Sequence, residues 1–220
     1  MKNNINVIYE DNHLLVVEKP INIPVQEDSS KDKDLLTILK EYLKEKYNKQ
    51  GNVYLGLVHR LDRPVGGVMV FAKTSKCASR LSNQVREGKF NKIYYAVVEN
   101  SINNEGVLTN KLLKDTKHNI VKVDDSGKPS KLEYKKIDEK NKLNLIKIKL
   151  YTGRSHQIRV QLSYNGNPLY GDQKYNKNAK VGEQLALFAK RLEFYHPITN
   201  ELLSFEIDLP NRYPFSLFKE

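Results

Sequence analysis

Cysteine is nearly absent from this sequence: among its 220 residues the only one is Cys77. An internal disulfide is therefore impossible, and a zinc site built from several cysteines is excluded as well. A chain without disulfides agrees with a reducing compartment, so we expect a cytoplasmic protein. Cys77 falls in a stretch with helical periodicity, where we expect a structural role and not a catalytic thiol.

Long hydrophobic runs are also missing. The apolar runs, such as 14–17, are far shorter than the roughly 20 residues that a membrane-spanning helix needs. The first residues lack the charged, apolar and small-residue succession of a signal peptide, and no repeat or low-complexity linker interrupts the chain. We therefore expect one globular domain over residues 1–220, without a membrane segment and monomeric by default.

Positive charge, in contrast, is abundant. The chain has 37 basic and 26 acidic residues, which gives a net charge of +11. A basic surface attracts polyanions, and nucleic acid is the commonest reason for one. A high content of Lys and Asn can also reflect an AT-rich genome, so the charge alone is weak evidence for RNA or DNA.

Extended patterns dominate the chain. Apolar runs and alternation predict strands at 5–10, 14–18, 53–58, 68–72, 94–98, 131–137, 143–150, 185–194 and 203–209. Helical patterns predict helices at 35–47, 76–86 and 155–164. The first is capped by Asp34, and the second is capped by Thr74-Ser75 and stopped by Gly88. Long strands with few helices predict an α+β domain with a large, mainly antiparallel mixed β-sheet flanked by helices and loops.

A charged cluster, His59-Arg60-Leu61-Asp62, follows an apolar strand, and then a proline and two glycines turn the chain sharply. Side chains exposed at the end of a strand often form functional sites. The alternative is a solvated loop in which arginine and aspartate pair with each other. The pattern alone leaves both interpretations open.

Four segments in order resemble the RluA-type RNA pseudouridine synthases. They are similar to that family's H-R-L-D-x-x-T-S-G, K-x-Y-x-A-x-V, T-G-R-[ST]-H-Q-[IL]-R and G-x-P-[IL]-x-G-D blocks, at residues 59–67, 91–98, 152–160 and 165–172. Residues 16–20 and 194–197 fit as well, so the resemblance covers nearly the whole chain. Each block alone is moderately specific, whereas four in order are highly specific.

The resemblance implies an isomerase that converts a specific uridine in rRNA or tRNA into pseudouridine. The family breaks the N1–C1′ bond, rotates the uracil and joins C5 to C1′, and it needs no cofactor because nothing is oxidised and no group leaves. A carboxylate suits this reaction as a nucleophile or as a cation stabiliser. A glycosidase normally uses two carboxylates and a water, whereas an isomerase has to keep water out.

Three residues match the family's catalytic positions. Asp62 matches the catalytic aspartate, and Arg159 matches the arginine that forms a salt bridge with it and keeps it ionised. Tyr94 matches the tyrosine that stacks on the flipped uracil, with a core tyrosine on a strand as the alternative. Whether Asp62 attacks C1′, attacks C6 or acts through a glycal stays open. Tyr95 points to the opposite face of its strand and serves as a structural control.

Five further residues are predicted to contact RNA: Lys19, His59, Arg60, Arg154 and His156. Arg60 matches the family arginine near the extruded base, whose gap it fills. Arg154 and His156 precede a helix whose N-terminus attracts phosphate. For His59 a structural hydrogen bond is the alternative. No metal site is expected, because the spacing of His59, His156 and Asp172 does not support one.

The chain departs from the family pattern at two places. Val65-Gly66-Gly67 stands where many members have T-S-G, and Phe188 stands where a histidine often precedes the alanine. The pattern begins within the first ten residues, so we expect no N-terminal RNA-binding module of the S4 type. Target choice then falls to the catalytic domain. Its basic stretches 76–89 and 111–149 are candidate surfaces, with solvated lysines as the alternative.

Two other classes of function remain open. One is a catalytically inactive RNA-binding relative, and the intact set of Asp62, Tyr94 and Arg159 argues against it. The other is an RNA or nucleoside N-glycosidase, which would release free uracil, whereas a synthase leaves the mass of the RNA unchanged.

Overall fold

The computed structural model describes residues 5–218, which form two compact units. The first contains the residues up to Phe90 together with Arg191–Ile207, and the second contains Asn91–Lys190 and the residues from Asp208 onward. Strand β10 (Leu187–Tyr195) passes along the chain from the second unit into the first. The single domain expected over residues 1–220 stays a prediction.

The first unit is built on antiparallel pairs of strands. β2 (Leu14–Lys19) lies between β1 (Asn6–Glu10) and β4 (Gly66–Ala72). The two-residue β3 (Gly56–Leu57) also pairs with β4, and β11 (Leu202–Glu206) pairs with the end of β10. Every residue of β4 is buried, and most of β2 is buried too, which explains their continuous apolar sequences.

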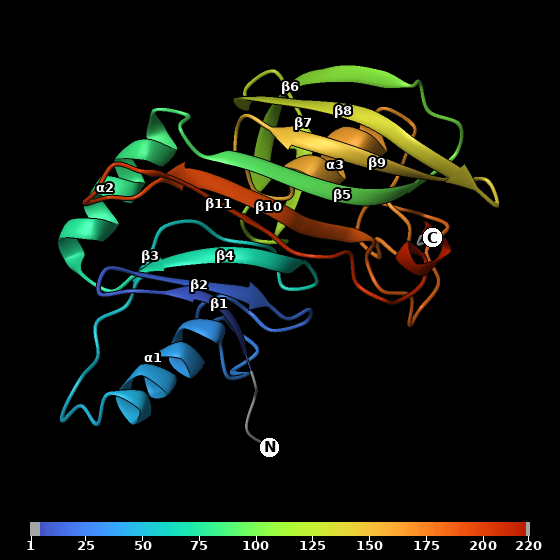
Figure 1. Ribbon diagram of the computed structural model, residues 1–220. Coiled ribbons are helices and arrows are strands. Elements are labelled where there is room, and N and C mark those ends of the chain that lie inside the picture. The colour runs from blue at the N-terminus through green and yellow to red at the C-terminus, as the bar shows by residue number, and fades with distance from the viewer. Residues whose placement is uncertain (1–4, 219–220) are drawn as a thin grey trace. The chain divides into compact units, whose positions relative to one another are not determined.

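Two helices complete this unit, and both begin at the predicted caps. The Asp34 carboxylate accepts the N–H of Thr37 at 3.0 Å and starts α1 (Leu35–Lys46). Thr74 accepts the N–H of Cys77 at 3.2 Å and starts α2 (Ser75–Arg86), which packs on β3 and β4. Figure 1 shows α1 next to β1 and β2. Cys77 is buried in the core, as its expected structural role requires.

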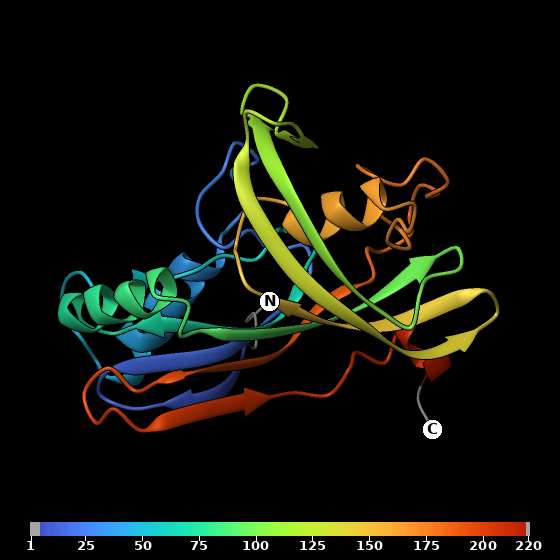
Figure 2. The same cartoon turned by 90° about the horizontal axis from the view of Figure 1, so that it is seen from above.

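The second unit is an antiparallel sheet with the strand order β5–β9–β8–β6–β7. Its strands are β5 (Asn91–Glu99), β6 (Glu105–Asp115), β7 (Ile120–Val123), β8 (Lys128–Lys140) and β9 (Leu143–Leu150). Helix α3 (Gln157–Tyr164) packs against β6 and β7, and Figure 2 shows it, in orange, beside the long curved strands β6 and β8. The 3₁₀ helix η1 (Phe215–Phe218) lies near β8.

The predicted α+β class is confirmed: strands dominate, and residues 5–218 contain three α-helices. The sequence missed β6 and β7, where charged residues and the adjacent Leu112 and Leu113 break the alternation of apolar and polar positions. These strands form because β6 pairs with β8 and β7 pairs with β6, a long-range effect that local patterns do not record. The last predicted strand, 203–209, ends at Glu206.

In the part of the chain that the structure describes, no helix is both long and apolar enough to cross a membrane.

Candidate active-site residues

Asp62 lies in the turn that connects β3 to β4. Its carbonyl oxygen accepts the N–H of Val65 at 2.9 Å, which closes a four-residue turn over Arg63 and Pro64. The side chain of Asp62 is half-buried, and the preceding Leu61 is buried. The turn therefore holds a carboxylate at the border of the core.

Lys19, at the end of β2, holds this turn through hydrogen bonds from its buried side chain. Only 1% of the residue is exposed, and its Nζ donates to the carbonyl oxygens of Pro20, Arg63 and Val65 at 2.9, 3.0 and 2.8 Å. These three bonds use all the donors of an ammonium group. Burial lowers the pKa of Lys19 to about 7, although the charge of Asp62 raises it. The predicted contact of Lys19 with RNA stays a prediction beside this structural role.

His59 ties the same loop to β4. β3 pairs with β4 only at Gly56 and Leu57, and the Nε2 atom of His59 then accepts the N–H of Val70 at 3.2 Å. The side chain thus continues the hydrogen bonding of the strand after the backbone has turned away. An accepting Nε2 places the hydrogen of a neutral imidazole on Nδ1. This bond supports the structural alternative for His59, while the neighbouring Arg60 is exposed.

Tyr94 lies in the middle of β5 and is 7% exposed. It pairs with Ile148 of β9, which pairs with Tyr134 of β8, so these three side chains share one face of the sheet. The same face carries Asn110 of β6, whose side chain binds Gln161 of α3 at 2.9 Å. Tyr94 is therefore on the face that α3 covers.

Arg159 projects from α3 and is 6% exposed. Its Nε and Nη2 atoms donate to the two carboxylate oxygens of Asp172 at 2.8 and 2.6 Å. The carboxylate also accepts the backbone N–H groups of Lys174 and Tyr175 at 3.0 and 3.2 Å. Such a fork fixes both the position and the plane of a guanidinium group. The sequence marked Asp172 only as part of a motif and did not identify this partnership.

Tyr175 links three parts of the second unit. Its ring lies under Arg159, with the guanidinium carbon 5.2 Å from the ring centre. Its hydroxyl oxygen accepts the N–H of Val121 in β7 at 2.9 Å and lies 2.6 Å from Nδ1 of His156. Sequence reasoning missed Tyr175, because a tyrosine in a loop carries no local pattern that signals such contacts.

His156 and Arg154 lie at the start of α3. His156 is 9% exposed and adopts a left-handed backbone conformation with φ of 51°, which is uncommon for a residue other than glycine. Its Nδ1 atom lies 2.6 Å from the hydroxyl oxygen of Tyr175. Arg154 is exposed, and its Nε donates to the carbonyl of Pro129 at 3.0 Å. Arg154 therefore offers an anchored cation at the surface, as an RNA contact requires.

The eight predicted residues fall into two groups. Lys19, His59, Arg60 and Asp62 gather around one turn of the first unit. Arg154, His156 and Arg159 gather around α3 of the second unit, whose sheet carries Tyr94 on the face that α3 covers. Among residues 5–218, no group of three or more His, Cys, Asp and Glu side chains is arranged to hold a metal ion.

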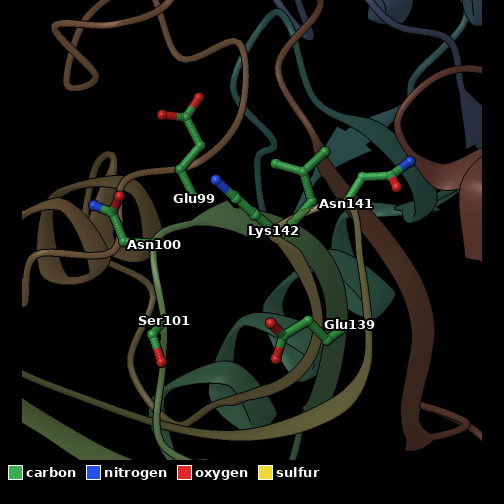
Figure 3. A pocket seen from close by; sticks show the side chains of 7 residues that line it. Glu99, Asn100, Ser101, Glu139, Asn141 and Lys142 are labelled. Atoms are coloured by element: carbon green, nitrogen blue, oxygen red, sulfur yellow. The ribbon is translucent and has the colours of Figure 1, made fainter.

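A hollow of about 450 Å³ lies elsewhere in the second unit (Figure 3). It opens where β5 ends and where β8 turns into β9. The residues that line it are mainly polar: Glu99, Asn100, Ser101, Glu139, Asn141, Lys142 and Leu143. None of the eight predicted residues contributes to it, so this hollow does not belong to the candidate active site.

Comparison with known proteins identifies relatives along nearly the whole chain. Residues 13–164 match the family model described as RNA pseudouridylate synthase. The chain is 34% identical to ribosomal large subunit pseudouridine synthase C of Vibrio vulnificus, and the match covers 93% of this chain and 65% of that protein. It is also 34% identical to an uncharacterized RNA pseudouridine synthase of Aquifex aeolicus, over 95% of this chain and 71% of that protein.

The fold has a solved counterpart as well. The structure of human RNA pseudouridylate synthase domain containing 4 superimposes with a TM-score of 0.81 at 22% sequence identity. The match covers 97% of this chain and 92% of that one. At 22% identity this similarity shows a shared fold and nothing more.

Proposed function

The chain belongs to the RluA-type family of RNA pseudouridylate synthases, and we propose that it isomerises a specific uridine in ribosomal or transfer RNA with Asp62 as the nucleophile. The Vibrio vulnificus relative is named for the large ribosomal subunit, so large-subunit rRNA is the first substrate to test. The protein would act in the cytoplasm as a monomer, without a cofactor.

The observation that carries this proposal is the support around Asp62. A nucleophile works when its position is fixed by groups that do not themselves react. The hydrogen bond from Val65, the three bonds of the buried Lys19 and the link from His59 to β4 restrain the turn that presents the carboxylate. A solvated loop, the alternative interpretation of the sequence, would not need a buried lysine to hold its carbonyl groups.

The other two residues are assigned roles that suit their surroundings. Tyr94 offers a phenol ring on a rigid strand, which suits a platform for an extruded uracil. Arg159 is oriented by Asp172 and would keep the Asp62 carboxylate ionised and correctly placed. Arg154 and His156 would contact the phosphates of the RNA, and Arg60 would fill the gap that the flipped nucleotide leaves.

Deletion of the gene followed by carbodiimide mapping of pseudouridine in total RNA tests the proposal. We expect one site to disappear and to return with the wild-type gene but not with Asp62→Ala. An unchanged map, in a strain without a second enzyme for the same site, would contradict the synthase. Free uracil in place of pseudouridine would identify the N-glycosidase instead. Restoration of the site by Asp62→Ala would remove Asp62 from the chemistry.

A further inference from the structure

The face of the second unit that lies opposite Tyr94 carries a cluster of cations. Side chains alternate along a strand, so Tyr95 points away from Tyr94. Tyr95 pairs with Lys147 of β9, and Lys147 pairs with Lys135 of β8. Lys190 of β10 lies over the same tyrosine, with its Nζ 5.7 Å from the ring centre. A row of three lysines therefore crosses the sheet beside one aromatic ring.

Lys135 and Lys147 form an unfavourable pair in the protein alone. Like charges that face each other directly across two strands destabilise a sheet. Both side chains are exposed, and in the described part of the chain neither forms a salt bridge, although Glu105 faces Lys135 from β6. A surface that tolerates this repulsion is suited to an anionic partner.

The neighbouring row repeats the combination of lysines and an aromatic ring. Tyr151, just after β9, is 40% exposed, and the Nζ atoms of Lys131 and Lys149 lie 4.7 and 5.0 Å from its ring centre. Glu133 accepts the Tyr151 hydroxyl at 2.7 Å and lies 3.7 Å from Lys131. Across both rows, the lysines outnumber the carboxylates Glu105 and Glu133, so these residues together carry a net positive charge.

We propose that this basic face binds a second segment of the RNA substrate, apart from the segment that presents the target uridine. The basic face is formed by Tyr95, Lys131, Lys135, Lys147, Lys149, Tyr151 and Lys190. Interleaved cations and aromatic rings bind single-stranded RNA through its phosphates and bases with little dependence on sequence. The proposal rests on the proposed function and adds to it: binding energy comes from a surface on the reverse of the sheet that carries Tyr94.

The test compares two triple variants with the same loss of charge. Lys135→Gln/Lys147→Gln/Lys149→Gln removes the centre of the basic face. Lys44→Gln/Lys49→Gln/Lys177→Gln removes three exposed lysines elsewhere. The probe is total RNA from a strain that lacks the gene. Its binding is measured by filter retention over a series of salt concentrations, and pseudouridine formation is measured with the same RNA.

We expect the first variant to bind RNA about tenfold more weakly at 0.15 M salt, with a salt slope smaller by about 2, because three phosphate contacts are lost. Its KM should rise while kcat at saturating RNA stays within about twofold. The control should stay within about twofold of the wild type in both measurements. Equal effects of the two variants, or none, would overturn the proposal. If the wild-type protein forms no pseudouridine, the proposed function fails, and the binding comparison still decides whether the basic face contacts RNA.

Discussion

The guanidinium group of Arg159 and the carboxylate of Asp172 form a two-pronged ion pair in which both side chains are buried, 7% and 0% exposed. Arg159 leaves α3 on the side of Asp172, and two backbone N–H groups hold the carboxylate from behind. The sequence assigned Arg159 as the partner of Asp62. The structure adds Asp172, which orients Arg159 and is therefore a positioning residue.

Replacement of this partner should affect both stability and activity. Asp172→Asn keeps the shape of the side chain but removes the negative charge that faces the buried guanidinium group, so we expect a loss of about 3 kcal/mol in the free energy of unfolding. Pseudouridine formation should fall by about 100-fold, because small displacements of catalytic groups are costly. Urea unfolding and single-turnover assays check the two effects. Asp208→Asn, at an exposed position, is the matched control.

Two substitutions of Tyr175 should distinguish the role of its hydroxyl group from the role of its ring. Tyr175→Phe keeps the ring under Arg159 but removes the bonds of the hydroxyl to Val121 and His156. We expect KM for RNA to rise while kcat stays within about threefold. Tyr175→Leu removes the ring as well and should also lower kcat. The same fall in kcat for both variants would show that the ring does not position Arg159.

The buried Lys19 should give stability a pH dependence above neutrality. Its pKa is about 7 in the folded protein, because of burial, against 10.5 for an ordinary lysine. Between these values the unfolded chain binds more protons, so the contribution of Lys19 to the free energy of unfolding rises with pH, by up to about 1.4 kcal/mol per unit. The free energy of unfolding of the wild type minus that of Lys19→Met, measured with urea, should increase from pH 7 to pH 9. A constant difference would contradict the lowered pKa.

Glu10 should protect the first unit against acid. Burial raises its pKa, but hydrogen bonds from Lys46, Lys73, Tyr47 and Tyr42 outweigh that effect and hold the pKa at about 2, below the ordinary value of 4.5. The stabilisation is present above pH 4.5 and is lost as the pH falls towards 2. Glu10→Gln should therefore be clearly less stable than wild type at pH 6. The difference in the free energy of unfolding should become smaller as the pH falls from 4.5 towards 2. An equal difference in the free energy of unfolding at pH 3 and at pH 6 would refute the lowered pKa of Glu10.

Much of the fold could be predicted because its signals are local. The local sequence predicts the helix caps at Asp34 and Thr74 and the buried strands β2 and β4. β6 and β7 escaped prediction, because their pairing with distant strands, and not their own sequence, makes them extended.

The residues of the site divide in the same way. The motifs identified the positions 62, 94 and 159 by resemblance. The partners that hold the site, Lys19 on three carbonyl groups, Asp172 on Arg159 and Tyr175 on His156, depend on contacts between segments far apart in sequence or on loop geometry. No spacing rule records such contacts, so they became visible only in three dimensions.

The reaction product formed by the purified protein tests the role of Asp62 most directly. RNA from the deletion strain is incubated with the wild-type protein or with Asp62→Asn, digested to nucleosides and analysed by mass spectrometry. We predict that the wild type forms pseudouridine without free uracil, and that Asp62→Asn forms neither while it binds RNA within about twofold of the wild type. Pseudouridine formation by Asp62→Asn at the wild-type rate, or release of free uracil by the wild type, would contradict the account.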